Sequence, residues 1–328
     1  MVADPASSNL FYPRGGCQSS SASTTISSSA SPTPSALSRL AKFPCDELAF
    51  ETQSQTLYAI NLTTGFYYRI GPATLFLDTV NALAYHPQEN YLYAIAQRNS
   101  AYGYIVRIGA GGTYETVPNG IIEQTGFNPP VSINVGEMDL NYNYWLAQNN
   151  GKSWVQVDLN SSSSTYGRVI NNGTTNMAVL NSQSTNYVVA DWAYLPAWAA
   201  NKLYSLGKQD KGGGTGYNTH LLQWDMTTKN FTQLVTYPDF AGGGNGTASW
   251  GAMYSTNDGF LYATENTSGR IYKFDISNPN ASGYTFVSQG PAGSANDGAR
   301  CQNGPPPASS KKKRTGGLES GHRRDTAV

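Results

Sequence analysis

Acidic side chains at one repeated position are the feature of this sequence that could do chemistry. Five similar segments of the chain begin at Asp46, Asn81, Gly136, Ala190 and Trp250. Aligning their starts places Glu47, Glu137 and Asp191 in one column. Acids are only 18 of the 259 residues from position 43 to 301, so three in a column of five exceed what composition predicts. If the segments are equivalent strands, the alternation of side chains along a strand directs these three carboxylates toward similar surroundings.

Carboxylates that converge repel one another, so at least one should hold a proton or the group should bind a cation. Calcium suits such a cage because it takes about six to eight oxygen ligands. The candidate ligands are Glu47, Glu137, Asp139 and Asp191. Apart from that ion, nothing in the sequence requires a cofactor. A second hypothesis makes Glu47, Glu137 and Asp191 the acid, base or nucleophile of a glycoside hydrolase or lyase. A third is that these acids bind backbone amides and only stabilise the fold.

Four further residues are candidates for contact with a ligand. Trp192 and Trp250 could stack against sugar rings, although Trp is also favoured in strands, where it packs between neighbours. Glu265 in YATENTSG and Asp297 in SANDGAR could join a site carried by loops at one face of the protein. An ordinary tight turn is the alternative for Asp297, because Asp directly before a glycine is typical of turns.

Repetition along the chain predicts the elements that must position these residues. The unit appears as DELAF, TLYAINLTTG and FYYRIG, and again as NALAY, HPQENYLYAIA, YIVRIG and TYETV. Its starts are 35 to 60 residues apart, and each unit contains about four short strands with polar turns. Such units match the blades of a β-propeller. We therefore expect an all-β propeller of about five four-stranded blades. Six or seven blades, or a two-sheet sandwich, are the alternatives.

Cysteines lie at both ends of the repetitive region. A bridge between Cys45 and Cys301 would tie the first strand to the last and close the ring, and it would persist only in an oxidising compartment. Two unrelated thiols are the alternative, and Cys17 is left over in either case. We expect a disordered Ser/Thr-rich segment over residues 1–41, the propeller over 42–303, and a disordered basic tail over 304–328.

Composition excludes several classes of protein. No apolar run approaches the roughly 18 residues that a membrane-spanning helix needs. Residues 43 to 301 contain 12 Lys and Arg against 18 Asp and Glu, a net charge of −6, which argues against nucleic-acid binding. Zinc-site spacings, the G-x-S-x-G elbow and the P-loop are absent from the sequence. We expect a monomer.

Signals for secretion are mixed. The opening residues, MVADPASSNLFYPRGG, have no apolar stretch typical of a signal peptide, so we expect either a missing upstream segment or another route. N-x-[ST] sequences occur at Asn61, Asn160, Asn172, Asn230, Asn245, Asn266 and Asn280. About five would arise by chance at this composition, so these sequences permit secretion without establishing it.

Several strings resemble a known family. They are LYAINLTTG, VNALAYHPQENYLYAIA, YVVADWAY, WGAMY, GFLYATENTSGRIYKF and the terminal SANDGARC. Together they are similar to a fungal family of mostly extracellular, propeller-like proteins whose domain has no known function, over roughly Cys45 to Cys301. The resemblance implies the fold and an extracellular or cell-wall location, but no activity. We expect a noncatalytic binding module for a glycan, cell-wall polymer or protein partner at a cell surface. A propeller glycoside hydrolase or lyase is the alternative.

Overall fold

The computed structural model describes residues 40–97, 102–123, 133–148, 150–176, 187–212, 216–243 and 249–307. The fold belongs to one compact unit of the chain, Leu40–Val328. The predictions for residues 1–39 and 308–328 lie outside the described residues. No helix in the described ranges is long and apolar enough to cross a membrane.

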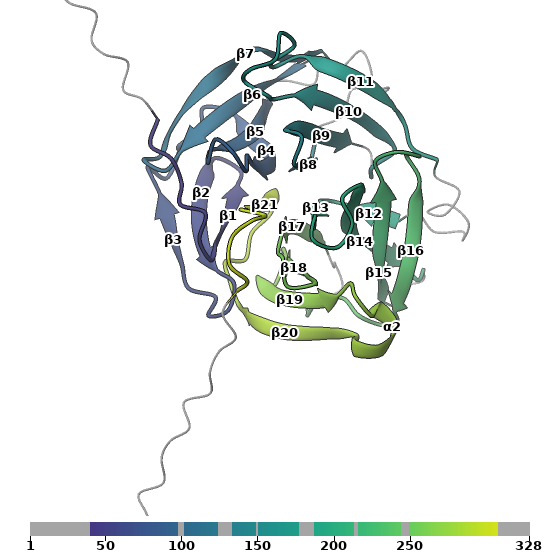
Figure 1. The fold of residues 1–328 in the computed structure, drawn as a ribbon. Helices are drawn as coiled ribbons and strands as arrows, with labels where there is room; N and C mark the ends of the chain where they lie inside the picture. Colours follow the sequence, from purple (N-terminus) through teal and green to yellow (C-terminus); the bar gives the residue numbers. More distant parts are fainter. Residues whose placement is uncertain are drawn as a thin grey trace, which may run out of the picture. The chain divides into compact units, whose positions relative to one another are not determined.

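Five antiparallel sheets surround a common axis as the blades of a propeller (Figure 1). From the axis outward, blade 1 consists of β21 (Asn296–Arg300), β1 (Leu48–Gln53), β2 (Thr56–Asn61) and β3 (Tyr67–Ile70). Blade 2 consists of β4 (Thr79–Tyr85), β5 (Leu92–Gln97), β6 (Tyr102–Gly109) and β7 (Thr113–Glu123). Blade 3 consists of β8 (Val135–Met138), β9 (Asn143–Gln148), β10 (Ser153–Asp158) and β11 (Val169–Thr174).

The innermost position of blade 4 is shared by two short strands. The blade consists of β12 (Tyr187–Val189) and β13 (Ala193–Tyr194), which both pair with β14 (Lys202–Asp210), and then β15 (Tyr217–Asp225) and β16 (Phe231–Tyr237). Blade 5 consists of β17 (Trp250–Tyr254), β18 (Phe260–Glu265), β19 (Arg270–Asp275) and β20 (Tyr284–Gln289), with α2 (Pro279–Ser282) before β20. The predicted all-β propeller with five four-stranded blades is confirmed.

Both ends of the repetitive region contribute to blade 1. The last strand, β21, pairs with β1 and takes the position nearest the axis. The predicted disulfide is present: Cys45 and Cys301 are bonded, with their Cα atoms 5.3 Å apart. We aligned the segment from Asp46 with the other four starts, but it is not equivalent to them. That segment forms the second strand, because the chain's last strand lies between it and the axis.

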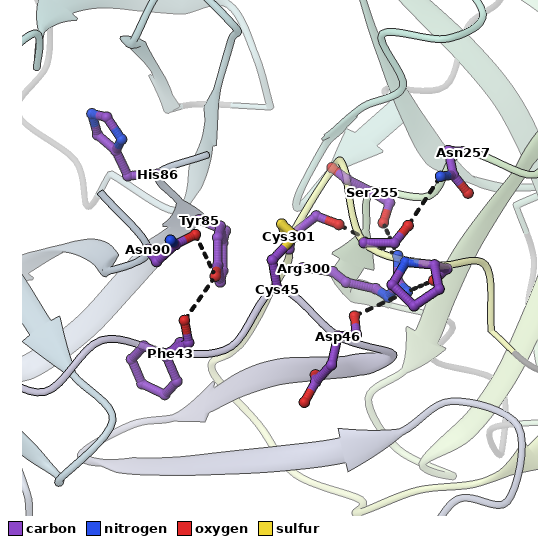
Figure 2. The surroundings of a disulfide bond; sticks show 12 residues. Phe43, Cys45, Asp46, Tyr85, His86, Asn90, Ser255, Asn257, Arg300 and Cys301 are labelled. Carbon is purple, nitrogen blue, oxygen red and sulfur yellow. Dashed lines mark hydrogen bonds between the residues drawn. A yellow bond between two sulfur atoms is a disulfide. The ribbon is translucent and has the colours of Figure 1, made fainter. Parts of the chain in front are cut away.

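The closure is reinforced by a buried arginine beside the disulfide (Figure 2). The guanidinium of Arg300 donates to main-chain carbonyls from both ends of the region, including those of Asp46 and Pro305, and to that of Ser255. Burial lowers the pKa of Arg300 below its ordinary value. Carbonyl oxygens around the guanidinium supply the hydrogen bonds that it loses by leaving water, so it joins the two ends of the chain.

Apolar residues fill the spaces between neighbouring blades. Strand residues alternate between the two faces of each sheet, so each blade contributes side chains to two clusters. The junction of blades 1 and 2 contains Phe50, Leu57 and Leu83, and that of blades 3 and 4 contains Trp145 and Trp224. Each blade therefore buries both faces only in the complete ring.

Candidate functional site

Three carboxylates lie on the innermost elements of their blades. Asp297 is on β21, Glu137 is on β8, and Asp191 joins β12 to β13. Their residues are 0%, 2% and 0% exposed. Glu137 and Asp191, which share a column in the sequence alignment, both lie on innermost elements. The third position belongs to Asp297, because β21 replaces the Glu47 segment at the axis.

Asp297 joins blade 1 to blade 2. Its Oδ2 accepts the main-chain N–H of Ala82 at 2.7 Å, and its Oδ1 accepts that of Leu83 at 2.9 Å. The ladder between β4 and β5 is irregular between Asn81 and Ala84, and Ala82 has a φ of 59°. The bulge turns two successive N–H groups toward one carboxylate, which satisfies both donors.

Glu137 makes the same kind of contact between blades 3 and 4, and Asp191 makes it between blades 4 and 5. Oε2 of Glu137 accepts the N–H of Tyr194 in blade 4 at 3.1 Å, and it also accepts the hydroxyl of Ser255. Oδ2 of Asp191 accepts the N–H of Met253 in blade 5 at 2.6 Å. The other oxygen of each carboxylate accepts the N–H of its own following residue. These arrangements match the hypothesis that the acids bind backbone amides.

Burial and mutual repulsion favour the protonated forms of these acids. Burial raises the pKa of Glu137 to about 7, although hydrogen bonds from Ser255 and from main-chain groups act in the opposite direction. The pKa of Asp191 rises well above its usual range through burial and the nearby charge of Asp297. Burial and, more weakly, Glu137 do the same for Asp297. These carboxyl groups are therefore favoured in the neutral, protonated form, and the ionised form is favoured only with a cation nearby.

The four predicted calcium ligands do not form a cage. Glu47 is exposed and precedes β1, the second strand of its blade, so it does not reach the axis. Oδ1 of Asp139 accepts the N–H of Asn141 at 2.8 Å, and its Oδ2 accepts Nε1 of Trp145 at 2.9 Å. Within the described ranges, no group of three or more His, Cys, Asp or Glu residues is arranged to hold a metal ion. Calcium binding at the remaining acids stays a prediction.

The four predicted ligand contacts are buried. Trp192 is 0% exposed and stacks on Trp224, with ring centroids 5.0 Å apart. Trp250 is 1% exposed and donates Nε1 to the Thr219 hydroxyl at 3.2 Å. Both tryptophans pack between blades, as their alternative interpretation predicted, and the stacking role was wrong.

The two acids that we predicted in loops, Glu265 and Asp297, also accept hydrogen bonds from main-chain N–H groups. Glu265 accepts N–H groups from Thr267 and Ser268 and closes the turn between β18 and β19. The turn interpretation of Asp297 was wrong, because this residue lies in β21 and binds blade 2. None of the predicted contact residues presents its side chain on the surface.

A pair of exposed aromatic rings on blade 1 was not predicted. Phe66 is 67% exposed and Tyr68, on the outer strand β3, is 47% exposed, with their ring centroids 6.2 Å apart. Tyr67 lies between them in sequence and packs edge-on against Tyr58, with centroids 5.8 Å apart. The run FYY indicated a strand but not its exposure, because both buried and outer strands contain such residues. We call Phe66 and Tyr68 the aromatic pair.

A family comparison identifies the repeats. Residues 48–303 match the family described as a repeat of unknown function (DUF6923). This chain belongs to that family. Membership in the DUF6923 family accounts for the repeated units along the whole propeller, whereas the fungal origin stays a prediction. No curated protein matches the chain.

Solved structures similar to this DUF6923 chain are diverse. The nidogen/laminin complex has 10% identity and a TM-score of 0.42, covering 78% of this chain and 99% of that chain. Hydrazine synthase of Kuenenia stuttgartiensis has 11% identity and a TM-score of 0.41, covering 73% and 76%. Streptogramin B lyase has 13% identity and a TM-score of 0.37, covering 76% and 71%. Likenesses at this level carry no argument about function.

Proposed function

We propose that this propeller is a noncatalytic extracellular binding module and that its partner is an uncharged polysaccharide, such as a cell-wall glycan. The aromatic pair carries the proposal. The two neighbouring rings, one directly before the outer strand β3 and one within it, form an exposed apolar surface with a phenolic hydroxyl. Aromatic faces of this kind suit the C–H surfaces of sugar rings, and the hydroxyl can bind sugar oxygens.

Net charge restricts the type of polymer. Residues 43 to 301 have a formal net charge of −6 with every acid ionised, and they stay net negative when the buried acids are protonated, so the body of the protein repels anionic polymers at neutral pH. An uncharged polysaccharide meets no such repulsion. Its binding should then depend weakly on salt, because aromatic stacking involves no ion pairs.

The buried positions of Asp297, Glu137 and Asp191 support a noncatalytic role. A catalytic carboxylate must reach its substrate, and in glycosidases a second carboxylate acts across the bond that breaks. Glu137 and Asp191 are buried and accept the N–H groups of Tyr194 and Met253. A substrate at these oxygens would have to displace hydrogen bonds between blades. The geometry therefore suits holding the ring together better than attacking a sugar.

The disulfide supports the extracellular location. The Cys45–Cys301 bond joins the chain across 256 residues and persists in oxidising compartments. Secretion would place the aromatic pair where cell-wall polymers are found.

Polysaccharide-array binding of the full chain tests this function. We expect binding to a neutral polysaccharide that survives chelation of calcium. The double variant Phe66→Ala and Tyr68→Ala should weaken the Kd at least about tenfold, or roughly 1.4 kcal/mol. The matched control is Phe286→Ala, which removes a ring 52% exposed on β20 of blade 5 and should leave the affinity unchanged.

Other outcomes of the array discriminate among the alternatives. Equal loss of affinity in the double variant and in the control would remove the aromatic pair as the contact. Loss of binding on chelation would support the calcium hypothesis. An array without any binding, for a protein that is folded, would contradict the glycan and favour a protein partner.

A further inference from the structure

In four of the five blades, the turn between the third and fourth strands has the same construction. In blade 1, Oδ1 of Asn61 accepts the N–H groups of Thr63 and Thr64 at 3.1 and 3.0 Å. In blades 3, 4 and 5, Asp158, Asp225 and Asp275 occupy the equivalent position at the end of the third strand. Each of these aspartates likewise accepts the N–H of the residue two places on. The turns are therefore structural equivalents, built as Asx turns.

Four N-x-Ser/Thr sequences coincide with these equivalent turns. Asn61 ends β2 and begins its turn, Asn160 and Asn230 lie within theirs, and Asn280 lies in α2, which is part of the connection from β19 to β20. The third and fourth strands are the outer two of each blade, so the turns lie at the outer edge of the ring (Figure 1). Only two other such sequences fall within the described ranges, at Asn172 in β11 and at Asn266 between β18 and β19. Four of the six such sequences in the described ranges therefore lie in one kind of connection.

Asn61 has a geometry that leaves its amide nitrogen available. Because Oδ1 accepts both turn N–H groups, the side chain is held by its oxygen, and Nδ2 takes no part in those two bonds. Asn230 and Asn280 are exposed, and Asn160 is half-buried at the start of its turn. Sugar added while a chain is folding is compatible with the native state only where the native surface leaves room for it.

Asn266, between β18 and β19 of blade 5, differs from Asn61 because its side-chain amide is packed against the fold. Its Oδ1 accepts the N–H of Gly251 on β17 at 2.9 Å. A Cβ atom placed on Gly251 would lie 2.5 Å from Nδ2 of Asn266, so that nitrogen is packed against the inner strand of its own blade. A sugar on this nitrogen would have to separate the turn from β17.

Blade 2 has no such sequence at the equivalent turn, which connects β6 and β7. There, the N–H of Ala110 donates to the carbonyl of Ala41 at 2.8 Å, and the hydroxyl of Tyr91 donates to that of Leu40 at 3.0 Å. The polypeptide that leads into blade 1 covers this part of the outer edge. A bulky modification would compete with that segment here. Two other turns also contact a neighbouring segment through their backbone. Oγ of Ser288 donates to the carbonyl of Leu62 in the blade 1 turn at 2.6 Å, and the N–H of Asn176 donates to that of Lys229 in the blade 4 turn at 3.4 Å. Neither of these two hydrogen bonds uses the side chain of Asn61 or Asn230.

We propose that the four asparagines on these turns are N-glycosylation sites and that Asn266 is not. In the transfer, Nδ2 forms a bond to the anomeric carbon of an N-acetylglucosamine, and the amide loses one proton. The donor is an oligosaccharide on a lipid pyrophosphate, and the pyrophosphate leaves with the electron pair of the broken anomeric C–O bond. The Cys45–Cys301 disulfide supports passage through an oxidising compartment, of the type in which this modification occurs. Four glycans then surround the ring and leave the edge of blade 2 bare.

Peptide mapping of the full chain, secreted by a eukaryotic host, tests the proposal. Enzymatic removal of the glycans in heavy-oxygen water marks each formerly modified asparagine as a labelled aspartate. We expect the label at Asn61, Asn160, Asn230 and Asn280 and none at Asn266. The same chain produced in bacteria, which should contain no label, gives the baseline.

Single variants assign each glycan without disturbing the asparagine itself. Thr63→Ala, Ser162→Ala, Thr232→Ala and Ser282→Ala should each remove one glycan from the mass of the secreted protein. The matched control, Ser268→Ala, should remove none. Occupancy of fewer than three of the four turns, or a glycan on Asn266, overturns the proposal. Because the wild-type map alone decides this, a variant that fails to fold does not weaken the test.

Discussion

At the residue scale, three carboxylates connect inner strands of neighbouring blades, which belong to separate sheets. They are Asp297, Glu137 and Asp191. Each carboxylate accepts an N–H group from the next blade, at Ala82, Tyr194 or Met253. The N–H groups of Ala82 and Tyr194 have a second acceptor, in Oδ1 of Asn81 and Oγ of Ser255. A buried N–H that is left without any acceptor costs about 1–3 kcal/mol. The acids therefore act as links between successive blades.

Substitution of Asp297 tests this role. In Asp297→Asn, one carboxylate oxygen becomes an NH2 group, which cannot accept the N–H of Ala82 or Leu83. We expect the free energy of unfolding in urea to fall by about 1–3 kcal/mol. The control Asp239→Asn alters an exposed carboxylate paired with Lys211, and it should change stability by less than about 0.5 kcal/mol.

Glu137→Gln and Asp191→Asn extend the same measurement to the enzyme hypothesis. A loss of stability in both variants, with no turnover of polysaccharide in any form of the protein, agrees with the linking role. Turnover by the wild type that disappears in variants of unchanged stability would instead establish catalysis.

The sequence predicted two of these three acids because they lie in recognisable strand starts. It missed the role of Asp297 because Asn-Asp-Gly is more typical of a turn than of a buried strand. A usable signal was present: a closed ring needs its last strand beside its first, and only the segment before Cys301 could supply one. Aligning that segment with the other starts places Asp297 in the column of Glu137.

At the scale of the strands, glycines bring neighbouring blades together at the two remaining junctions. These are the junctions of blades 2 and 3 and of blades 5 and 1. A Cβ atom on Gly136 of β8 would lie 2.5 Å from the carbonyl oxygen of Ala82 in blade 2. Similarly, a Cβ atom on Gly298 of β21 would lie 2.6 Å from the carbonyl oxygen of Met253 in blade 5. Inner strands therefore meet through a carboxylate at three junctions and through close backbone contact at two.

Gly136→Ala should disrupt the contact between blades 2 and 3. Because the new methyl group meets rigid backbone, we expect a loss of about 1–3 kcal/mol in the free energy of unfolding. Gly111→Ala is a matched control, since a Cβ atom there has no neighbour within 4 Å, and its stability should not fall. Equal stability of the two variants would contradict the close-contact interpretation.

The number of blades was predictable because apolar strands followed by polar turns recur at each unit. The exposure of individual aromatic residues was not predictable from the sequence. Trp192 and Phe66 have similar hydrophobic character, yet one is 0% exposed and the other 67%. The difference arises from distance to the axis: inner strands are covered by two neighbouring blades, whereas the outermost strand is partly free of them. Sequence periodicity shows alternation between faces but not position along the radius of a blade.

At the scale of the whole molecule, the buried acids connect stability to pH. Glu51 is a fourth member of this group. It is 0% exposed, accepts the hydroxyl of Tyr254 from blade 5 at 2.7 Å, and has a pKa raised by burial to about 7. The pKa values of Glu137, Asp191 and Asp297 are also raised. In the unfolded chain these acids have their ordinary pKa values, and in the folded ring the values are higher. At a pH between the two, the folded protein therefore binds more protons than the unfolded chain.

This excess of bound protons predicts greater stability in mild acid. The contribution of Glu137 is fully present below its ordinary pKa of 4.5 and is lost as pH rises through about 7, a difference of roughly 3 kcal/mol at most. His86 and His220 oppose this trend, because burial lowers the pKa of both, that of His220 to about 4, and their contributions are lost as pH falls below 6.5. Since four buried acids act in the first direction, we expect the free energy of unfolding in urea to be higher at pH 5 than at pH 8. Glu137→Gln should flatten this dependence, since it removes one of the titrating groups. A wild-type protein that gains stability from pH 5 to pH 8 would show that these acids are ionised in the folded ring, with their repulsion offset by a bound cation or by the backbone N–H groups.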